Sequence, residues 1–237
     1  MRHIHFKTLD STNAYLKTHY QDLKHMTLIT SDEQKEGYGR KHTPWVSTKD
    51  SATFSLLLKK DITLEQASLM PLLAAIAVHK VLYHYDHSLT IKWPNDLLYN
   101  QKKLAGILCE SITYGQDIKA LIIGIGININ QKSFKSPLTK DATSLTLMTH
   151  HTYVIPMIIK KCVIALKDEI KAFKRGSMAY FEYLNHYNAL KAKTVTVLVN
   201  QLEITGRVKG ITFKGHLEVM TPDGLIELSH GSITSIT

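Results

Sequence analysis

Two neighbouring segments in the middle of the chain decide its interpretation: Lys92-Trp93-Pro94-Asn95-Asp96 and Lys103-Leu104-Ala105-Gly106-Ile107-Leu108-Cys109-Glu110. The first ends a predicted strand over 89–93, and the second opens a predicted strand over 104–113 after a tight return. Hairpin geometry then brings Lys92, Asp96 and Lys103 to one end of a sheet. Two cations and a carboxylate that converge there suit a carboxylate substrate, a phosphate and Mg²⁺. The alternative is a polar turn between two core strands. This alternative is less favoured, because packing alone does not explain the sequence Trp-Pro-Asn-Asp at such a turn.

Further along the chain, glycines interrupt a β-rich run at Gly124-Ile125-Gly126-Ile127-Asn128-Ile129-Asn130. Glycine weakens a strand unless a ligand or another backbone must fit beside it. With strand alternation, Gly124 and Gly126 fall on one face together with Asn128 and Asn130. A strand with a β-bulge would explain the same glycines. A lone Gly-x-Gly does not distinguish a bulged strand from a ligand-binding one.

A short polar segment, Asp10-Ser11-Thr12-Asn13, separates a predicted strand from a predicted helix. Its hydroxyl and amide groups would lie beside the free backbone N–H groups of the helix start. Taken alone, the segment is an ordinary helix cap, with Ser11 as the capping residue.

The polar segment 31–47 has no hydrophobic period and is predicted to be a long loop. It contains the run Gln34-Lys35-Glu36-Gly37-Tyr38-Gly39-Arg40-Lys41-His42-Thr43-Pro44-Trp45. Its glycines let the backbone approach a ligand, and Arg40 and Lys41 offer donors and positive charge to a phosphate. Trp45 offers a flat apolar surface to an aromatic ring. The run matches neither the three-glycine dinucleotide motif nor GxxxxGK[ST], and a flexible surface loop is equally compatible with it.

The hydrophobic periodicity of the whole chain predicts an α+β fold, in which helices cover a mostly antiparallel sheet. Strands are predicted over 3–9, 26–30, 52–60, 89–93, 97–99, 104–113 and 118–129, and helices over 11–20, 63–85, 155–174 and 178–187. Pro71 is expected to kink or restart the second helix. After Leu190 the pattern changes to short strands over 194–199, 203–211, 216–220 and 225–228. We therefore predict one domain over 1–188 and a small β-barrel domain over 189–237.

Composition limits the class of protein. No run in the 237 residues approaches the ~20 continuous apolar residues of a membrane span, and the first residues lack the apolar core of a signal peptide. A cytoplasmic protein without membrane contact is therefore expected. Cys109 and Cys162 form no CxxC pair and the 13 histidines form no HExxH motif, so no zinc site is expected. The net charge of +9 fits an anionic partner or a solvated basic surface.

Taken together and in this order, the four segments resemble the biotin protein ligases. That family's pattern runs from Ser-Thr-Asn through a Gln and a Gly-Arg-Gly-Arg loop ending in Trp. It continues with Lys-Trp-Pro-Asn-Asp, Lys-Leu-Ala-Gly-Ile-Leu and Gly-x-Gly-Ile-Asn, so the match spans Asp10 to Asn130. The resemblance implies a catalytic fold related to class II aminoacyl-tRNA synthetases and to lipoate ligases, followed by a small SH3-like β-barrel. It also implies that ATP activates biotin to biotinyl-5′-AMP, with Mg²⁺, before biotin is transferred to one lysine of a carrier domain.

The resemblance implies a role for each matched position. Biotin would be bound by Ser11, Thr12, Asn13, Gln34, Gly37, Tyr38, Gly39, Arg40, Lys103, Gly106, Leu108 and Gly124. ATP would be bound by Arg40, Lys41, Trp45, Asn95, Lys103 and Asn128. Catalysis would depend on Lys103, Arg40, Lys92 and Asp96, with Lys103 bridging the biotin carboxylate and the α-phosphate. Lys92 and Asp96 would support metal, phosphate or the incoming amine, and no dedicated metal ligand is assigned.

One position departs from the family pattern, because Tyr38 stands where the family usually has arginine. A tyrosine can stack and donate one hydrogen bond, but it carries no charge. The loop would then rely on Arg40 and Lys41 for positive charge. We therefore expect the adenylate to be held less firmly here than in relatives with arginine.

The implied partner is the biotin carboxyl carrier protein or domain of an acetyl-CoA or pyruvate carboxylase, and a homodimer is compatible with the family. Only one strand precedes Asp10, so no helix-turn-helix domain and no DNA binding are expected. Three alternatives differ from a biotin ligase. A lipoate ligase shares the fold and the adenylate chemistry, but its Arg-Arg-x-Ser-Gly-Gly-Gly signature is absent. A non-catalytic biotin binder is kept open by Tyr38, and a nucleic-acid-binding protein would lack a reading helix or an aromatic RNA-binding strand.

Overall fold

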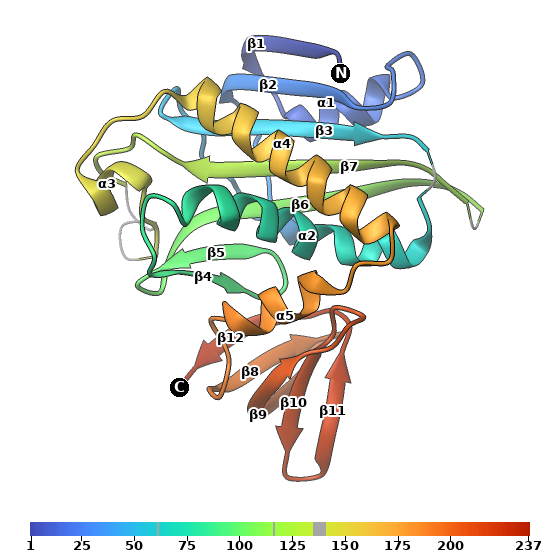
Figure 1. The fold of residues 1–237 in the computed structure, drawn as a ribbon, viewed down its shortest axis with the longest axis vertical. Coiled ribbons are helices and arrows are strands. Elements are labelled where there is room, and N and C mark those ends of the chain that lie inside the picture. Colours follow the sequence, from blue (N-terminus) through green and yellow to red (C-terminus); the bar gives the residue numbers. More distant parts are fainter. Residues whose placement is uncertain (61, 116, 135–140) are drawn as a thin grey trace.

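The computed structural model describes residues 1–60, 62–115, 117–134 and 141–237, and its strands form two separate sheets (Figure 1). The larger sheet has seven strands in the order β1-β2-β3-β7-β6-β5-β4. These strands are β1 (His3–Leu9), β2 (Thr27–Gln34), β3 (Ser51–Leu58), β4 (Leu89–Lys92), β5 (Asp96–Tyr99), β6 (Lys102–Tyr114) and β7 (Asp117–Asn128). Every neighbouring pair is antiparallel except β1 and β2, which are parallel. The predicted α+β class with a mostly antiparallel sheet is confirmed.

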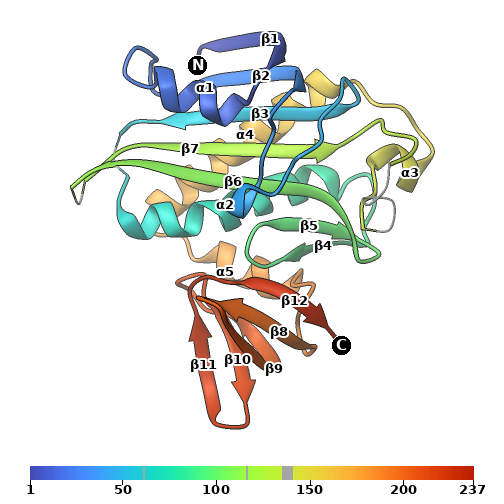
Figure 2. The ribbon, with the colours of Figure 1, turned by 180° about the vertical axis from the view of Figure 1, so that it is seen from behind.

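Helices cover both faces of this sheet. Its helices are α1 (Thr12–His19), α2 (Leu64–Leu82), α3 (Leu145–Thr149), α4 (Ile155–Lys174) and α5 (Ala179–His186). Helices α2 and α4 lie on one face (Figure 1), and α1 lies on the other (Figure 2). The main core forms under α2 and α4, while a smaller apolar cluster forms under α1 around Leu16, Ile29 and Ile122.

Local signals in the sequence set the helix starts. The Ser11 side chain accepts a hydrogen bond from the Ala14 backbone N–H, and Thr63 and Gln66 form a complete capping box. Pro71 does not restart its helix, because α2 runs through it without interruption. The reason is packing: the segment from Leu72 to Val78 is fully buried between the sheet and α4, and burial outweighs the loss of one backbone hydrogen bond.

The second sheet has five antiparallel strands in the order β11-β10-β9-β8-β12. They are β8 (Thr194–Val199), β9 (Leu202–Ile211), β10 (Leu217–Thr221), β11 (Gly224–Leu228) and β12 (Ser232–Ile236). Strand β12 is missed by the sequence analysis, because its alternating Ser, Ile and Thr follow no clear turn signal. The division of the chain at residues 188 and 189, and closure of the small sheet into a barrel, stay predictions.

Two hydrogen bonds, one buried and one partly buried, link the turn between β9 and β10 to the rest of the protein. The Trp93 indole N–H donates to the Gly215 carbonyl over 3.0 Å, and the Tyr180 hydroxyl donates to the Phe213 carbonyl over 2.6 Å. Trp93 is 1% exposed. The tryptophan of the segment Lys92–Asp96 therefore holds the turn between β9 and β10 and does not face solvent. In the described part of the chain, no helix is long and apolar enough to cross a membrane.

Candidate functional site

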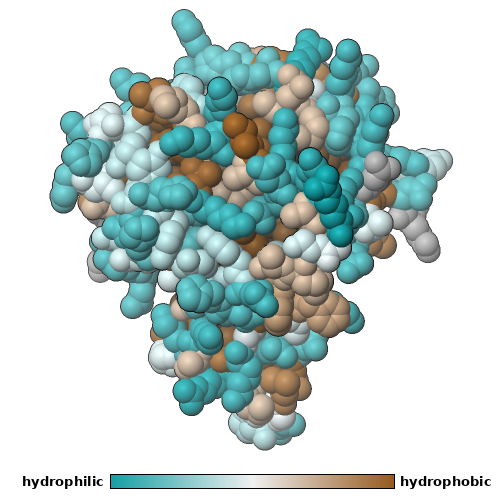
Figure 3. Space-filling model, viewed as in Figure 1, coloured by the Kyte–Doolittle hydropathy of each residue, from teal (hydrophilic) through white to brown (hydrophobic). Residues whose placement is uncertain are grey.

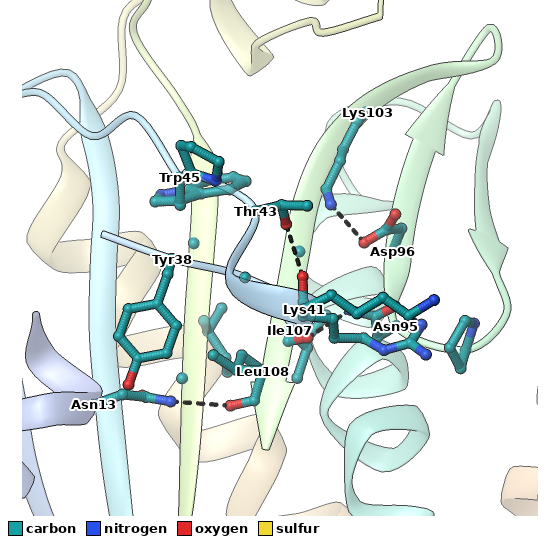
Figure 4. Close-up of a pocket in the computed structure, with 18 of the residues that line it drawn as sticks. Asn13, Tyr38, Lys41, Thr43, Trp45, Asn95, Asp96, Lys103, Ile107 and Leu108 are labelled. Carbon is teal, nitrogen blue, oxygen red and sulfur yellow. Dashed lines mark hydrogen bonds and ion pairs between the residues drawn. The ribbon is translucent and has the colours of Figure 1, made fainter. Parts of the chain in front are cut away.

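A pocket of about 260 Å³ opens on the face of the large sheet that carries α1 (Figure 4). Its walls are the start of α1, the segment between β2 and β3, the β4–β5 turn, the middle of β6 and β7, and the first residues of β12. Of the residues predicted from the sequence, its lining contains Ser11, Thr12, Asn13, Gln34, Tyr38, Gly39, Arg40, Lys41, Trp45, Lys92, Asn95, Asp96, Lys103, Gly106, Leu108 and Gly124. Four segments that lie far apart in sequence therefore meet in one cavity.

One end of the pocket is a neutral hydrogen-bonded cluster at the start of α1. The backbone N–H and the hydroxyl of Thr12 both donate to Gln34 Oε1, over 2.8 and 3.0 Å. Ser55 Oγ lies 2.6 Å from Thr12 Oγ1 and 2.6 Å from Asn13 Oδ1. Asn13 and Ser55 are buried, so these amide and hydroxyl groups are held in fixed orientations. Ser55 is a site residue that the sequence analysis missed.

The glycine loop, residues 37–45, folds back on itself as a short hairpin. The Trp45 N–H donates to the Gly37 carbonyl, and the Gly39 N–H donates to the Thr43 carbonyl, each over 2.8 Å. The irregular segment is shorter than predicted, because residues 31–34 continue β2. At the tip, Lys41 and His42 have φ angles of 53° and 56°, a left-handed conformation that costs energy for residues other than glycine.

Tyr38 holds this loop against the sheet. Its hydroxyl donates to Glu110 Oε2 over 3.1 Å, and its ring stacks on His42 with centroids 5.3 Å apart. Glu110 Oε2 also accepts from Asn13 Nδ2 over 2.8 Å, and Lys17 pairs with the other carboxylate oxygen at 2.9 Å. Burial and the Glu110 charge raise the pKa of Tyr38 to about 12, so its hydroxyl stays a donor at neutral pH. Glu110 ends the Lys103–Glu110 segment, and no local pattern in the sequence indicated its role.

Arg40 connects the loop to the small sheet and to the segment Lys92–Asp96. Its guanidinium donates to the Gly231 carbonyl over 2.7 Å and to Asn95 Oδ1 over 3.4 Å. Asn95 in turn donates to the Ile107 carbonyl over 2.7 Å. Burial lowers the pKa of Arg40, and nearby Asp96 opposes that effect. The loop cation is thus fixed from two sides, and the second sheet forms part of the site.

The other end of the pocket carries charge. Lys103 Nζ lies 2.7 Å from Asp96 Oδ1, and the dashed line between them is visible in Figure 4. Lys92 is paired with Asp96 across β4 and β5, so the hairpin predicted from the sequence is confirmed. Burial lowers the pKa of Lys92 and the neighbouring Lys103 lowers it further, while Asp96 acts in the opposite direction. The three groups form a half-buried cationic centre with one carboxylate.

Glycines form the floor between the two ends. A Cβ atom at Gly124 would lie 2.3 Å from Asn13 Oδ1, and one at Gly126 would lie 2.4 Å from Trp45 Cε2. A Cβ atom at Gly106 would lie 3.1 Å from Lys103 Nζ. At Gly124 and Gly126 glycine is required, because side chains from other elements occupy the space directly above the strand, whereas at Gly106 the neighbour is the flexible end of Lys103 on the same strand.

Trp45 stands over this floor with an unused hydrogen-bond donor. Its indole N–H is buried and has no acceptor within the described part of the chain. Lys103 Nζ lies 5.9 Å from the Trp45 ring centroid. A buried donor without an acceptor is costly, which is consistent with a ligand that completes the pocket.

Three residues singled out from the sequence do not reach the cavity lining. Gly37 packs against Gln34 and the Trp45 carbonyl, and Asn128 donates to the Lys103 carbonyl over 3.5 Å. Asn130 was expected to share a face with Gly124, but it follows the end of β7 and hydrogen-bonds with the Tyr153 backbone. Seven further lining residues belong to the quoted segments but had been given no individual role: Thr43, Pro44, Trp93, Pro94, Ile107, Ile125 and Gly126. The lining residues outside those segments, which were missed, are Thr53, Ser232 and Ile233. Ser232 and Ile233 belong to β12, which carried no sequence signal.

The chain resembles known proteins in both sequence and structure. The Biotin/lipoate A/B protein ligase family matches residues 5–128. The Bifunctional ligase/repressor BirA of Bacillus subtilis is 41% identical over 213 residues, which cover 87% of this chain and 65% of that protein. The solved structure of the biotin protein ligase from Aquifex aeolicus in complex with biotin and ATP has a TM-score of 0.87 and 28% identity, covering 100% of this chain and 98% of that one.

These matches define the class of protein. Because the family match covers more than half of the chain, the chain belongs to the biotin/lipoate A/B protein ligase family. The family resemblance expected from the four motifs is therefore confirmed. The chain spans 65% of the length of the BirA protein of Bacillus subtilis.

Proposed function

We propose that this protein is a biotin protein ligase, which activates biotin with ATP and transfers it to a lysine of a carrier domain. The supporting observation is the polarity of a single pocket, neutral at one end and cationic at the other. Biotin has the complementary polarity, since a neutral ureido ring is separated from a carboxylate by an apolar chain. In this arrangement Thr12, Asn13 and Gln34 bind the ring, and Leu108 and Gly124 flank the chain.

In the first half-reaction, an oxygen of the biotin carboxylate attacks the α-phosphorus of ATP. The new P–O bond forms as the bond to the β-phosphate breaks, so the products are biotinyl-AMP and pyrophosphate. Both reactants are anions, and the attack therefore needs cations that are in place beforehand. Lys103, held 2.7 Å from Asp96, bridges the carboxylate and the α-phosphate, while Arg40 and Lys92 stabilise the phosphate charge.

The glycine loop, residues 37–45, closes the pocket over the adenylate. A mixed anhydride hydrolyses in water, so the site must exclude solvent until the acceptor arrives. Gly39 and Lys41 of this loop bring backbone and charge to the phosphate, and Trp45 offers its ring to the adenine. The remaining positions assigned to biotin or ATP support this arrangement. Ser11 lies beside the ring, and Gly37 lies at the base of the loop. Asn128 supports Lys103, and Asn95 supports Arg40.

In the second half-reaction, the amine of a carrier lysine attacks the acyl carbon of the adenylate. An amide bond forms, the bond between the acyl carbon and the phosphate oxygen breaks, and AMP leaves. Among the described lining residues, Asp96 is the one carboxylate, which supports it as the group that receives the proton lost by the amine.

Mg²⁺ fits this donor set only together with the nucleotide. No group of three or more His, Cys, Asp and Glu side chains suited to a metal occurs among the described residues. The chain therefore offers Asp96 as one carboxylate ligand, and the phosphate oxygens would complete the coordination. When bound, the ion would add positive charge beside the phosphates.

The partner that we propose is a biotin carboxyl carrier domain of an acetyl-CoA or pyruvate carboxylase, in the cytoplasm, with a homodimer as the assembly that fits the family. A relative with 34% identity over 123 residues is the Biotin--[acetyl-CoA-carboxylase] ligase of Paracoccus denitrificans. DNA binding is not part of the proposal.

Transfer to a carrier tests this function. We expect purified protein, ATP and biotin to biotinylate a carrier domain at one lysine, detected by a mass shift and by avidin binding. A carrier with that lysine replaced by arginine is the matched control. Lipoylation in place of biotinylation would assign the protein to the lipoate branch, whereas tight biotin binding without any transfer would indicate a non-catalytic binder.

A further inference from the structure

A second cavity, of about 740 Å³, lies on the other face of the large sheet, between β1, β2 and α4. Its floor combines apolar side chains from β2 and α4 with polar ones such as Thr30 and Asn130. Leu28 on β2 and Ile159 and Val163 on α4 line it and are 3%, 9% and 1% exposed. The nucleotide and biotin pocket lies on the α1 face, so the two cavities are distinct.

Hydrophobic side chains continue from this floor to the protein surface. Val154 and Ile164 line the same cavity and remain 61% and 50% exposed. Figure 3, viewed from the side that carries α4, shows hydrophobic side chains among hydrophilic ones over the upper part of the molecule. A cavity of this size falls in the range of small-molecule sites, ~300–1,000 Å³.

The rim of the cavity is positively charged. Lys49, Lys160 and Lys167 line it. Asp32 is the one acidic residue in the described lining, and it lies 3.5 Å from His5 Nε2. A floor that carries apolar side chains, with excess cations at its edge, is complementary to an amphipathic anion.

We propose that this cavity binds a free fatty acid, with the acyl chain against Leu28, Ile159 and Val163 and the carboxylate among the three rim lysines. The chain gains by leaving water, and the carboxylate keeps solvent while it meets Lys160 and Lys167. Both requirements are met by one small molecule, whereas a neutral lipid would leave the lysines without a partner. This inference is independent of the proposed ligase activity.

The test uses dodecanoate below its micelle concentration, with binding to the full-length protein measured by calorimetry. We expect one molecule per chain, and at least tenfold weaker binding of methyl dodecanoate. Equal binding of acid and ester would contradict the role of the lysines. Undetectable binding of dodecanoate, or binding only to vesicles, would overturn the proposal.

Paired variants locate the ligand. Lys160→Glu/Lys167→Glu is expected to weaken dodecanoate binding at least tenfold, and Lys171→Glu, an exposed position on the same helix outside the lining, is the control. Ile164→Trp would fill the cavity mouth and abolish binding, while Met157→Trp, 57% exposed on α4 and outside the lining, would not. Unchanged affinity in Ile164→Trp would overturn the assignment, as would concentration-dependent self-association that competes with dodecanoate. Biotin-dependent pyrophosphate exchange reports separately on the ligase, so failure of one proposal does not imply failure of the other.

Discussion

The two faces of β7 perform different tasks with residues that alternate along one strand. On one face, Ile123 and Ile127 belong to the core under α2 and α4, and both are 0% exposed. On the opposite face, Gly124 and Gly126 leave room for Asn13 and Trp45. One strand thus carries both the packing that holds the fold and the open floor of the pocket. Changes on the pocket face should affect chemistry, and changes on the core face should affect stability.

The largest effect is expected at the charged end of the pocket. Lys103→Met removes a preorganised cation from the reacting anions, so we expect adenylation to fall ~10²–10³-fold with little change in folding. The measurement is single-turnover formation of biotinyl-AMP, with the melting temperature recorded in parallel. Lys102→Met, the exposed neighbour in sequence, is the control. Retention of more than a tenth of the rate would exclude Lys103 from catalysis.

On the core side of the sheet, His79 is expected to affect stability and not catalysis. Burial lowers the pKa of His79 to about 4 despite a hydrogen bond with the Leu89 carbonyl. Its ring also contacts the Tyr183 hydroxyl at 2.8 Å. Between about pH 6.5 and 4 the unfolded chain takes up a proton that the folded protein refuses, so stability falls as the pH falls through that window. A shift of this size corresponds to about 3 kcal/mol.

His79→Gln keeps an amide for both hydrogen bonds but cannot titrate. We expect its unfolding free energy, from urea denaturation, to depend less on pH between 6.5 and 4 than that of the original protein. His84→Gln, an exposed change on the same side of the molecule, is the control. Parallel pH curves for all three proteins would show that His79 is not the group responsible.

An intermediate effect is expected on the pocket floor. In Gly124→Ala the added carbon would lie 2.3 Å from Asn13 Oδ1 and displace the amide that we propose binds the ureido ring. Overpacking of this kind costs about 1–3 kcal/mol, so the KM for biotin should rise about tenfold or more while the KM for ATP changes little. Gly106→Ala provides the comparison, because there the neighbour is the flexible end of Lys103, and kcat should fall instead. Identical kinetic changes in both variants would contradict separate roles for the two ends.

The smallest effect is expected at Tyr38. Tyr38→Phe removes only the hydrogen bond to Glu110, worth about 1 kcal/mol, so biotinyl-AMP should dissociate several-fold faster. Tyr38→Arg would place a positive charge beside the Glu110 carboxylate and slow that dissociation. Stopped-flow release of the adenylate measures both, with the exposed Tyr114→Phe as control. An unchanged release rate in Tyr38→Arg would contradict the view that the missing charge loosens the loop.

Much of this architecture follows from patterns that act locally in the sequence. The capping residues Ser11 and Thr63, the β4–β5 hairpin and the alternation along β7 were all predictable because neighbouring residues determine them. The meeting of Lys92, Asp96 and Lys103 followed from hairpin geometry alone. In each case the decisive contacts lie within one element or between adjacent ones.

The features that were missed depend on contacts between distant parts of the chain. Strand β12 has an ordinary Ser, Ile and Thr composition, yet Ser232 and Ile233 line the pocket and the preceding Gly231 accepts a hydrogen bond from Arg40. Glu110 likewise acquires its role through Asn13, Lys17 and Tyr38, which approach from two other elements. No local period or turn signal encodes such meetings.

Biotin-dependent exchange of labelled pyrophosphate into ATP tests the central claim most directly, because it isolates the adenylation step from the carrier. We expect exchange with biotin, none with lipoate, and loss of exchange in Lys103→Met at an unchanged melting temperature. Exchange with lipoate alone would move the protein to the other branch of its family. Absence of exchange with either acid, despite biotin binding, would contradict the assignment of the cationic end as a catalytic centre.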